Sequence, residues 1–186
     1  MDTQVKLRAI TADLKNNHID RDEVIDGLML ATISREHILF LGPPGANKTN
    51  LVVDFNSYID KSKYFYWLMG QFTSPEEVFG PIDIAGMKNG VYQRIVTHKL
   101  PSANIAVLDE CFKASTAILN SLLHILNERK FENDSNVINV PLHFVCGASN
   151  ELPETTENLS AFRGPEGRDR RGSLSDRGAA IRIRSE

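Results

Sequence analysis

The segment of residues 37–49, with the sequence HILFLGPPGANKT, constrains the fold of this chain more than any other. A short apolar run ends at a glycine, a loop rich in glycine and proline follows, and helical spacing of apolar residues begins at the Lys-Thr pair. The length and context of the apolar run predict a buried strand. The order of strand, loop and helix is close to the phosphate-binding pattern G-x-x-x-x-G-K-[ST], in which loop N–H groups and the start of the helix face an anion. The pattern therefore predicts an α/β fold that binds a nucleotide.

The loop departs from this pattern at one position, because Asn47 stands where the second glycine is usual. Glycine permits positive φ and close approach to a ligand, and asparagine is among the residues that best tolerate the left-handed conformation. We expect Lys48 to reach the β- and γ-phosphates of ATP and Thr49 to ligate Mg²⁺. The alternative is a turn rich in glycine and proline that only happens to precede a lysine. The expected nucleotide contacts are Gly42, Pro43, Pro44, Gly45, Ala46, Asn47, Lys48, Thr49 and Asn50.

Patterns of helix and strand alternate along the rest of the chain. Apolar residues recur at helical spacing in residues 5–17, 21–34, 48–59 and 114–130. Apolar runs typical of strands cover residues 37–42, 63–70, 104–110 and 141–150. We expect Asp20 to cap the second helix and the extended segments 90–101 and 130–141 to form hairpins. Alternation of this kind predicts a three-layer sandwich with a central, mostly parallel sheet.

Polar residues end two of the predicted strands. Asp109 and Glu110 follow the apolar run NIAVL, about 60 residues after Lys48. Asn150 is the last residue of the apolar run at residues 141–150. Ligands of open α/β sheets lie at the carboxyl ends of the strands. We therefore expect Asp109 to hold Mg²⁺ through water, Glu110 to polarise the attacking water and Asn150 to position it. Alone, solvated acids at a strand end and an asparagine in a turn are the commoner interpretations. The candidate catalytic residues are Lys48, Glu110 and Asn150, and the candidate metal ligands are Thr49 and Asp109.

Four stretches resemble the AAA+ ATPases, and the resemblance is closest to the MoxR-like branch and, within it, the regulatory ATPase variant A (RavA) type. These stretches are LFLGPPGANKT, FGPIDIAGMKNGVY, VLDECFKASTAILNSLLHILNERKF and CGASNELPE. The resemblance covers roughly residues 5 to 162. It implies that Lys48 and Thr49 belong to Walker A, that Asp109 and Glu110 form Walker B, and that Asn150 is sensor 1. RavA-type members also lack a glycine before the Walker lysine, so Asn47 resembles a tolerated variation.

The same resemblance implies a biological role. Family members are hexameric ATPases that bind nucleotide between subunits and act on other proteins as remodelling or metal-insertion chaperones, often with a von Willebrand A-type partner. We therefore expect ATP and Mg²⁺ as ligands, self-association into a ring and a client protein. The alternative is a catalytically impaired nucleotide-binding or assembly module that lacks an arginine finger and a lid.

The resemblance ends just past Phe162. The family continues with an arginine supplied to the neighbouring subunit, a last core strand and a helical lid, and the arginine position falls near Pro165. Residues 163–186 hold seven of the twelve arginines and none of the nine lysines. Such a composition buries too little apolar surface to offset chain entropy. We expect an incomplete ATPase core at residues 1–162, truncated before its last strand and lid, and a disordered or non-native tail at residues 163–186.

Composition argues against several other classes of protein. A net charge of −3 gives no field that favours nucleic acid or anionic membranes. The chain has no apolar run near the ~20 residues of a membrane span, and its polar start is unlike a secretory signal. Two cysteines, Cys111 and Cys146, suggest packed thiols in a reducing compartment, so we expect a cytoplasmic protein. His37 is expected to be a hydrogen-bonded surface residue, with a position near the adenine as the alternative.

Overall fold

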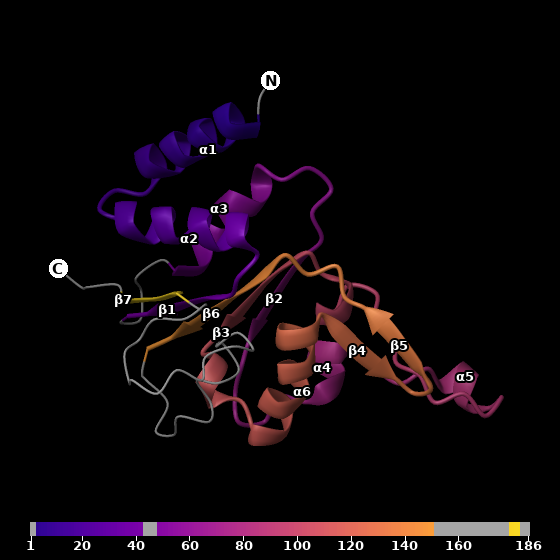
Figure 1. Ribbon diagram of the computed structural model, residues 1–186. Helices are drawn as coiled ribbons and strands as arrows, with labels where there is room; N and C mark the ends of the chain where they lie inside the picture. The colour runs from indigo at the N-terminus through magenta and orange to yellow at the C-terminus, as the bar shows by residue number, and fades with distance from the viewer. Residues whose placement is uncertain (1–2, 43–47, 151–178, 183–186) are drawn as a thin grey trace, which may run out of the picture.

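The computed structural model describes residues 3–42, 48–150 and 179–182, and it has a five-stranded parallel sheet at its centre (Figure 1). The order of the strands is β2-β3-β6-β1-β7. They are β1 (Ile38–Leu41), β2 (Tyr64–Leu68), β3 (Ile105–Asp109), β6 (Phe144–Ser149) and β7 (Ala179–Arg182). The predicted α/β sandwich with a parallel sheet is therefore confirmed.

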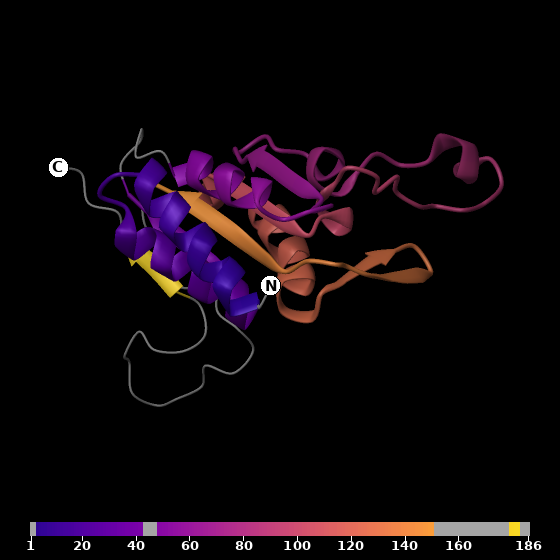
Figure 2. The same ribbon diagram turned by 90° about the horizontal axis from the view of Figure 1, so that it is seen from above.

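Helices cover both faces of the sheet, as Figures 1 and 2 show. One face carries α1 (Thr3–Asn17), α2 (Asp22–Ser34) and α3 (Lys48–Ser57). The opposite face carries α4 (Pro75–Phe79) and α6 (Thr116–Glu128). Shorter pieces are α5 (Ile84–Met87), η1 (Leu100–Ser102) and η2 (Cys111–Lys113), and β4 (Lys130–Asn133) pairs with β5 (Asn136–Asn139) in an antiparallel hairpin.

The two faces of the sheet explain why its strands are continuous apolar runs. In β3, Ala106 and Leu108 pack in the core under α6, whereas Ile105 and Val107 pack in the core under α3. Successive side chains of a strand point to opposite faces, so a strand that is covered on both sides needs an apolar residue at every position. This core fixes the positions of the ends of the strands and of the polar residues at those ends.

Local signals set the limits of α6, the most strongly amphipathic helix in the described residues. At its start, the Ser115 side chain accepts a hydrogen bond from the N–H of Ile118. At its end, Arg129 adopts the left-handed conformation and its N–H donates to the carbonyl of Ile125 at 3.1 Å. The helix buries Ile118, Leu119, Leu122, Ile125 and Leu126 against the sheet.

Three local expectations differ from the structure. Asp20 does not cap α2: it has a φ of 58°, and Arg21 precedes the helix without a side-chain cap. Residues 90–101 do not form a hairpin of their own; they contain η1 and a single bridge between Ile82 and Arg94. Within the tail, which we expected to be disordered, residues 179–182 form β7 beside β1. The predicted hairpin at residues 130–141 is confirmed as β4 and β5.

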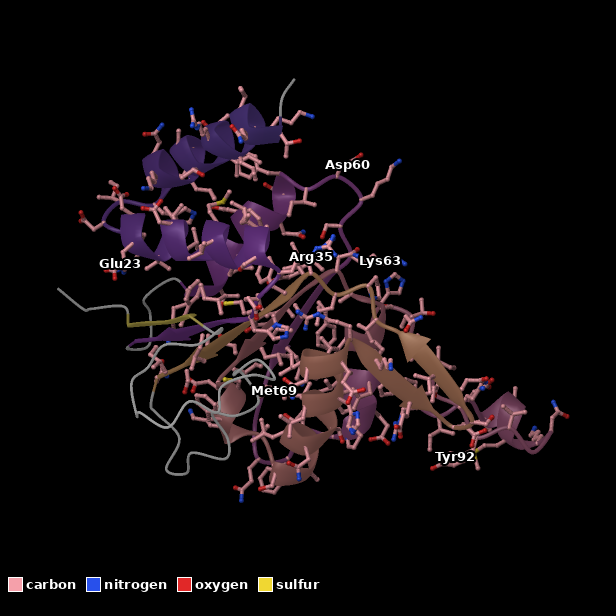
Figure 3. The ribbon with its side chains drawn as sticks, viewed as in Figure 1. Glu23, Arg35, Asp60, Lys63, Met69 and Tyr92 are labelled. Carbon is pink, nitrogen blue, oxygen red and sulfur yellow. The ribbon has the colours of Figure 1, made fainter. Side chains whose placement is uncertain are left out.

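Two arms extend from the sheet in the same direction (Figures 1 and 2). The helical arm is residues 81–95 and contains α5, and the hairpin arm is β4 with β5. Asn133 joins them: its buried side chain accepts from the N–H of Arg94 at 2.7 Å and donates to the carbonyl of the same residue at 3.1 Å. Gly80 lies at the base of the helical arm and has a φ of 107°. A Cβ at this position would lie 2.1 Å from the carbonyl oxygen of Ile95. Tyr92 lies on the segment of the helical arm that returns from its tip, away from the sheet (Figure 3).

His37 is buried at the amino ends of the strands, so the expectation of a surface histidine is wrong. Its Nδ1 accepts from the N–H of Val145 at 2.9 Å, and its Nε2 lies 2.9 Å from the carbonyl of Leu126. The guanidinium of Arg129 contacts the ring and donates to the carbonyls of Leu126 and Arg35 at 2.5 and 2.9 Å. Figure 3 shows Arg35 at this edge of the sheet. Burial first, and the charge of Arg129 second, lower the pKa of His37 from 6.5 to about 4.

Among the described residues, the structure has no helix that is long and apolar enough to cross a membrane.

Candidate functional site

The candidate site lies at the carboxyl edge of the sheet, where β1, β3 and β6 end next to one another. The strand β6 lies between β1 and β3, so the polar residues that follow these strands converge although they are far apart in the sequence. This is the edge where open α/β sheets bind their ligands. The helix α3 begins here at Lys48 and directs its amino end towards the same region.

Lys48 is buried at this edge and is 8% exposed. Its Nζ donates to the carbonyls of Gly42 and Ser149 at 2.7 and 3.2 Å and to Oδ1 of Asn150 at 2.9 Å. Burial lowers the pKa of Lys48, and the nearby carboxylates of Asp109 and Glu110 oppose this shift. The ammonium group is therefore a buried donor with three oxygen partners, all within the loop and strand ends that surround the site.

Thr49 lies beside Asp109, as expected for two ligands of one metal ion. The Thr49 hydroxyl donates to Oδ2 of Asp109 at 3.3 Å, across 60 residues of chain. A hydroxyl and a carboxylate are oxygen ligands that suit Mg²⁺, which keeps several waters and takes its other ligands from phosphates. No group of three His, Cys, Asp or Glu side chains with metal-binding geometry occurs in residues 3–42 and 48–150. The Thr49 hydroxyl and the Asp109 carboxylate fit a magnesium ion that takes its other ligands from a nucleotide and water.

Glu110 has an unusual backbone conformation and a fixed side chain. Its φ and ψ are 50° and 39°, in the left-handed region that residues other than glycine rarely adopt. Its N–H donates to Oδ1 of Asp109 at 3.0 Å. Its Oε1 accepts from Nδ2 of Asn150, and its Oε2 lies 3.4 Å from the ammonium of Lys113. The turn thus directs the carboxylate of Glu110 towards Asn150 and Lys48.

The structure brings together the predicted catalytic residues and the predicted metal ligands. Lys48, Thr49, Asp109, Glu110 and Asn150 form one connected network, through the bonds given above. Gly42 joins it through its carbonyl and through its N–H, which donates to Ser149 at 3.2 Å, and Asn50 lies exposed in the first turn of α3. The predicted contacts at residues 43–47, which include Asn47, lie outside the described residues.

Two residues of this region were missed by the sequence analysis. Lys113 forms the ion pair with Glu110 described above, and its spacing of three residues was the available signal. Tyr66 on β2 lies next to Asp109: burial first, and then the charge and a hydrogen bond of this carboxylate, raise the pKa of the phenol. The strand β2 is visible in the sequence as an aromatic-rich run, but its pairing with β3 is not, so no pattern could place Tyr66 at the site.

The cysteines lie near this network but are packed as apolar groups. Cys111 and Cys146 are buried and not joined in a disulfide. Burial raises the pKa of both thiols, so neither is ionised near neutral pH. The expectation of packing over redox chemistry agrees with this burial.

A solved protein has the same fold. The crystal structure of "a putative ATPase" from Cytophaga hutchinsonii superposes with a TM-score of 0.68 at 16% identity, over 89% of this chain and 52% of that one. At this identity the likeness concerns the fold alone. It supports the three-layer arrangement described above.

Relatives are more similar in sequence. Two uncharacterized proteins of Methanocaldococcus jannaschii, MJ0079 and MJ0812, are 42% and 41% identical over 158 and 157 residues, which is 84% of this chain in both cases. The chain spans 41% and 42% of their lengths. The structural protein ORF618 of Acidianus two-tailed virus is 30% identical over 118 residues, which is 61% of this chain and 19% of that protein.

A sequence profile settles the family. The profile of the MoxR domain in the MoxR-vWA-beta-propeller ternary systems matches residues 5–164. This range contains the whole candidate network and every described element except β7 and the first two residues of α1. The chain therefore belongs to the MoxR-like AAA+ ATPases, in the domain family of the MoxR-vWA-beta-propeller ternary systems.

Proposed function

We propose that this chain binds ATP with Mg²⁺ at the carboxyl edge of the sheet and hydrolyses it. The observation that carries the proposal is the connected network in which Lys48 bonds to Asn150 and Thr49 bonds to Asp109. These contacts join the start of α3 to the ends of β3 and β6, where the γ-phosphate of a nucleotide held by the loop after β1 would lie. The family match supports this proposal.

In this proposal each residue of the network has one task. The Lys48 ammonium exchanges its carbonyl and amide acceptors for phosphate oxygens, which form stronger charge-assisted hydrogen bonds. Thr49 and Asp109 hold Mg²⁺, which neutralises charge on the β- and γ-phosphates when it is bound. Asn150 turns its amide to the attacking water, and the Glu110 carboxylate accepts the proton of that water. Hydrolysis is then positioning and electrostatic stabilisation by preformed groups.

Asn47 and the RavA-type grouping belong to the same proposal. We propose that the loop holds phosphate with its main-chain N–H groups despite the asparagine, since asparagine tolerates the left-handed conformation. The absence of a glycine before Lys48 is a feature shared with the RavA type. Calorimetry of Asn47→Gly measures the effect: ATP affinity within about twofold of that of the natural chain is expected if the carboxamide is tolerated.

Beyond the nucleotide, we propose self-association into a ring, a client protein that the ring remodels, and a von Willebrand A-type partner. The description of the matched family, a MoxR domain in ternary systems with vWA and β-propeller proteins, supports a partner of this kind. Mixing the chain with a protein that contains a vWA domain, with and without ATP, and measuring mass in solution tests these assemblies. A chain that stays monomeric under all conditions contradicts the ring and the partner together.

The second candidate function is nucleotide binding without turnover. The observation in its favour is that both carboxylate oxygens of Glu110 already have partners from the chain itself. Calorimetry with Mg²⁺-ATP and phosphate release from the natural chain and from Glu110→Gln separate the two. Binding with turnover that falls in Glu110→Gln supports the ATPase. Binding with equal background rates supports the binding module, and no heat at millimolar nucleotide contradicts both.

A further inference from the structure

The Glu110 carboxylate is held from two directions. Asn150 donates to its Oε1, and the ammonium of Lys113 lies 3.4 Å from its Oε2. The Glu110 side chain is 15% exposed and that of Lys113 is 63% exposed, so the pair lies at the border between the site and solvent. The orientation of the carboxylate, which decides where it can accept a proton, thus depends on these two donors.

The two donors differ in their links to the nucleotide site. Asn150 also accepts a hydrogen bond from Lys48 at 2.9 Å, so it belongs to the part of the network for which a triphosphate competes. Lys113 lies on the other side of Glu110, in η2. Its N–H donates to the carbonyl of Glu110 at 2.8 Å and closes the turn that keeps the two side chains adjacent. Cys111, the first residue of η2, is fully buried and anchors this turn in the core.

We propose that Lys113 is a positioning residue for Glu110. When nucleotide binds, Lys48 and Asn150 turn to phosphate and water, and Asn150 releases Oε1. Lys113 keeps Oε2, so the carboxylate stays directed at the site and Oε1 becomes the atom that takes the proton. The inference rests on the proposed function, and it adds a residue whose contribution is exerted through Glu110 without contact to the nucleotide.

Steady-state kinetics provide the first test. Lys113→Met lowers kcat for ATP about three- to fivefold, the size expected for loss of one partly exposed ion pair, and leaves KM within about twofold, since binding does not use Lys113. Lys113→Arg retains most of the turnover because it restores the charge. Lys130→Met, a change of the same kind at an exposed residue of β4, leaves kcat unchanged. An unchanged kcat in Lys113→Met, or a loss that arginine does not restore, overturns the proposal.

A second measurement does not depend on turnover. A water-soluble carbodiimide activates a carboxylate, and an adjacent lysine amine then attacks the carbonyl carbon, so that an amide forms and the urea of the reagent leaves with the elements of water. Mass spectrometry should find a peptide that joins Glu110 to Lys113, lighter by one water, in similar yield with and without a non-hydrolysable Mg²⁺-ATP analogue. Lys113→Met is the blank.

The outcomes separate the inference from the function on which it rests. A cross-link that is missing, or that is lost when the analogue binds, overturns the role of Lys113 while leaving nucleotide binding intact. A natural chain that gives no heat with Mg²⁺-ATP overturns the proposed function and with it the role of Lys113. Binding together with a cross-link that persists supports both.

Discussion

The two edges of the central sheet both bury polar side chains, but they satisfy them with different partners. At the amino edge, His37 and Arg129 bond chiefly to main-chain carbonyls and N–H groups. At the carboxyl edge, Lys48, Asn150 and Glu110 bond to one another as well as to the main chain. A main-chain partner stays in place while the chain is folded, whereas a side-chain partner can turn away to make room for a ligand. Buried polarity alone therefore does not identify a site, but exchangeable partners do.

Removal of the Lys48 ammonium should show the largest effect and should act on binding. Lys48→Met is expected to weaken ATP affinity about a thousandfold, because two charge-assisted hydrogen bonds to phosphate together contribute about 4 kcal/mol. The free energy of unfolding should change by less than about 1 kcal/mol, since the substitution also removes the desolvation cost of a buried charge. Calorimetry and urea unfolding measure the two quantities. A large loss of stability with little loss of affinity would make Lys48 a structural residue like Arg129.

The opposite result is expected at the amino edge. Arg129→Ala leaves the carbonyls of Leu126 and Arg35 without this donor, and it should lower the free energy of unfolding by about 3 kcal/mol. The ATP affinity of the folded protein should remain as it is. Arg8→Ala, at an exposed position of α1, serves as the control. If Arg129→Ala weakens ATP binding without affecting unfolding, the contrast between the two edges fails.

The pH dependence of stability tests the same edge. His37 has a pKa of about 4 in the folded chain and 6.5 when unfolded, so the unfolded chain binds the proton first as the pH falls. The stabilisation is fully present above pH 6.5 and is lost as the pH falls from 6.5 towards 4, by about 2 kcal/mol at pH 5. Urea unfolding at a series of pH values measures the slope, and His37→Gln should remove this part of it. Equal slopes in the two proteins would contradict a buried neutral imidazole.

The smallest expected effect concerns the metal at the carboxyl edge. Thr49→Val removes the hydroxyl beside Asp109 and should weaken binding of Mg²⁺-ATP about tenfold, whereas Thr49→Ser should retain it, because one lost metal or hydrogen-bond contact costs about 1.4 kcal/mol. With the metal removed by a chelator, the three proteins should bind ATP alike. A valine variant that is equally impaired without Mg²⁺ would place the effect of Thr49 in packing and not in metal binding.

The sequence predicted the parts of the fold that depend on local patterns. Strands β1, β3 and β6 were visible as apolar runs because both of their faces are covered, and the ends of β3 and β6 carried the polar residues that meet at the site. Convergence of Asp109 and Asn150 on Lys48 followed from the rule that parallel strands place their carboxyl ends at one edge. General topology was sufficient for these residues.

The features that sequence reasoning missed depend on contacts between distant segments. His37 was expected at the surface, but its burial depends on Arg129, 92 residues later, which closes the amino edge over it. The segment 90–101 has an extended pattern, but several of its main-chain bonds go to residues 81–86 of the same arm, and those of Arg94 go to the Asn133 side chain beside the turn of the hairpin arm. The four residues of β7 are too few to give a recognisable periodic pattern. Their position is defined only by their parallel pairing with β1.

The bonds of Asn133 have a mechanical consequence for the two arms. A single carboxamide takes the place of a ladder partner for Arg94, so the turn end of the hairpin arm is tied to the helical arm. Gly80 lies at the base of the helical arm, where the close approach of Ile95 leaves no room for a Cβ. Movement of the helical arm at Arg94 must therefore either move the Asn133 end of β4 or break these two bonds. The two arms are attached to the sheet separately and to each other at Asn133, which limits how far either arm can bend alone.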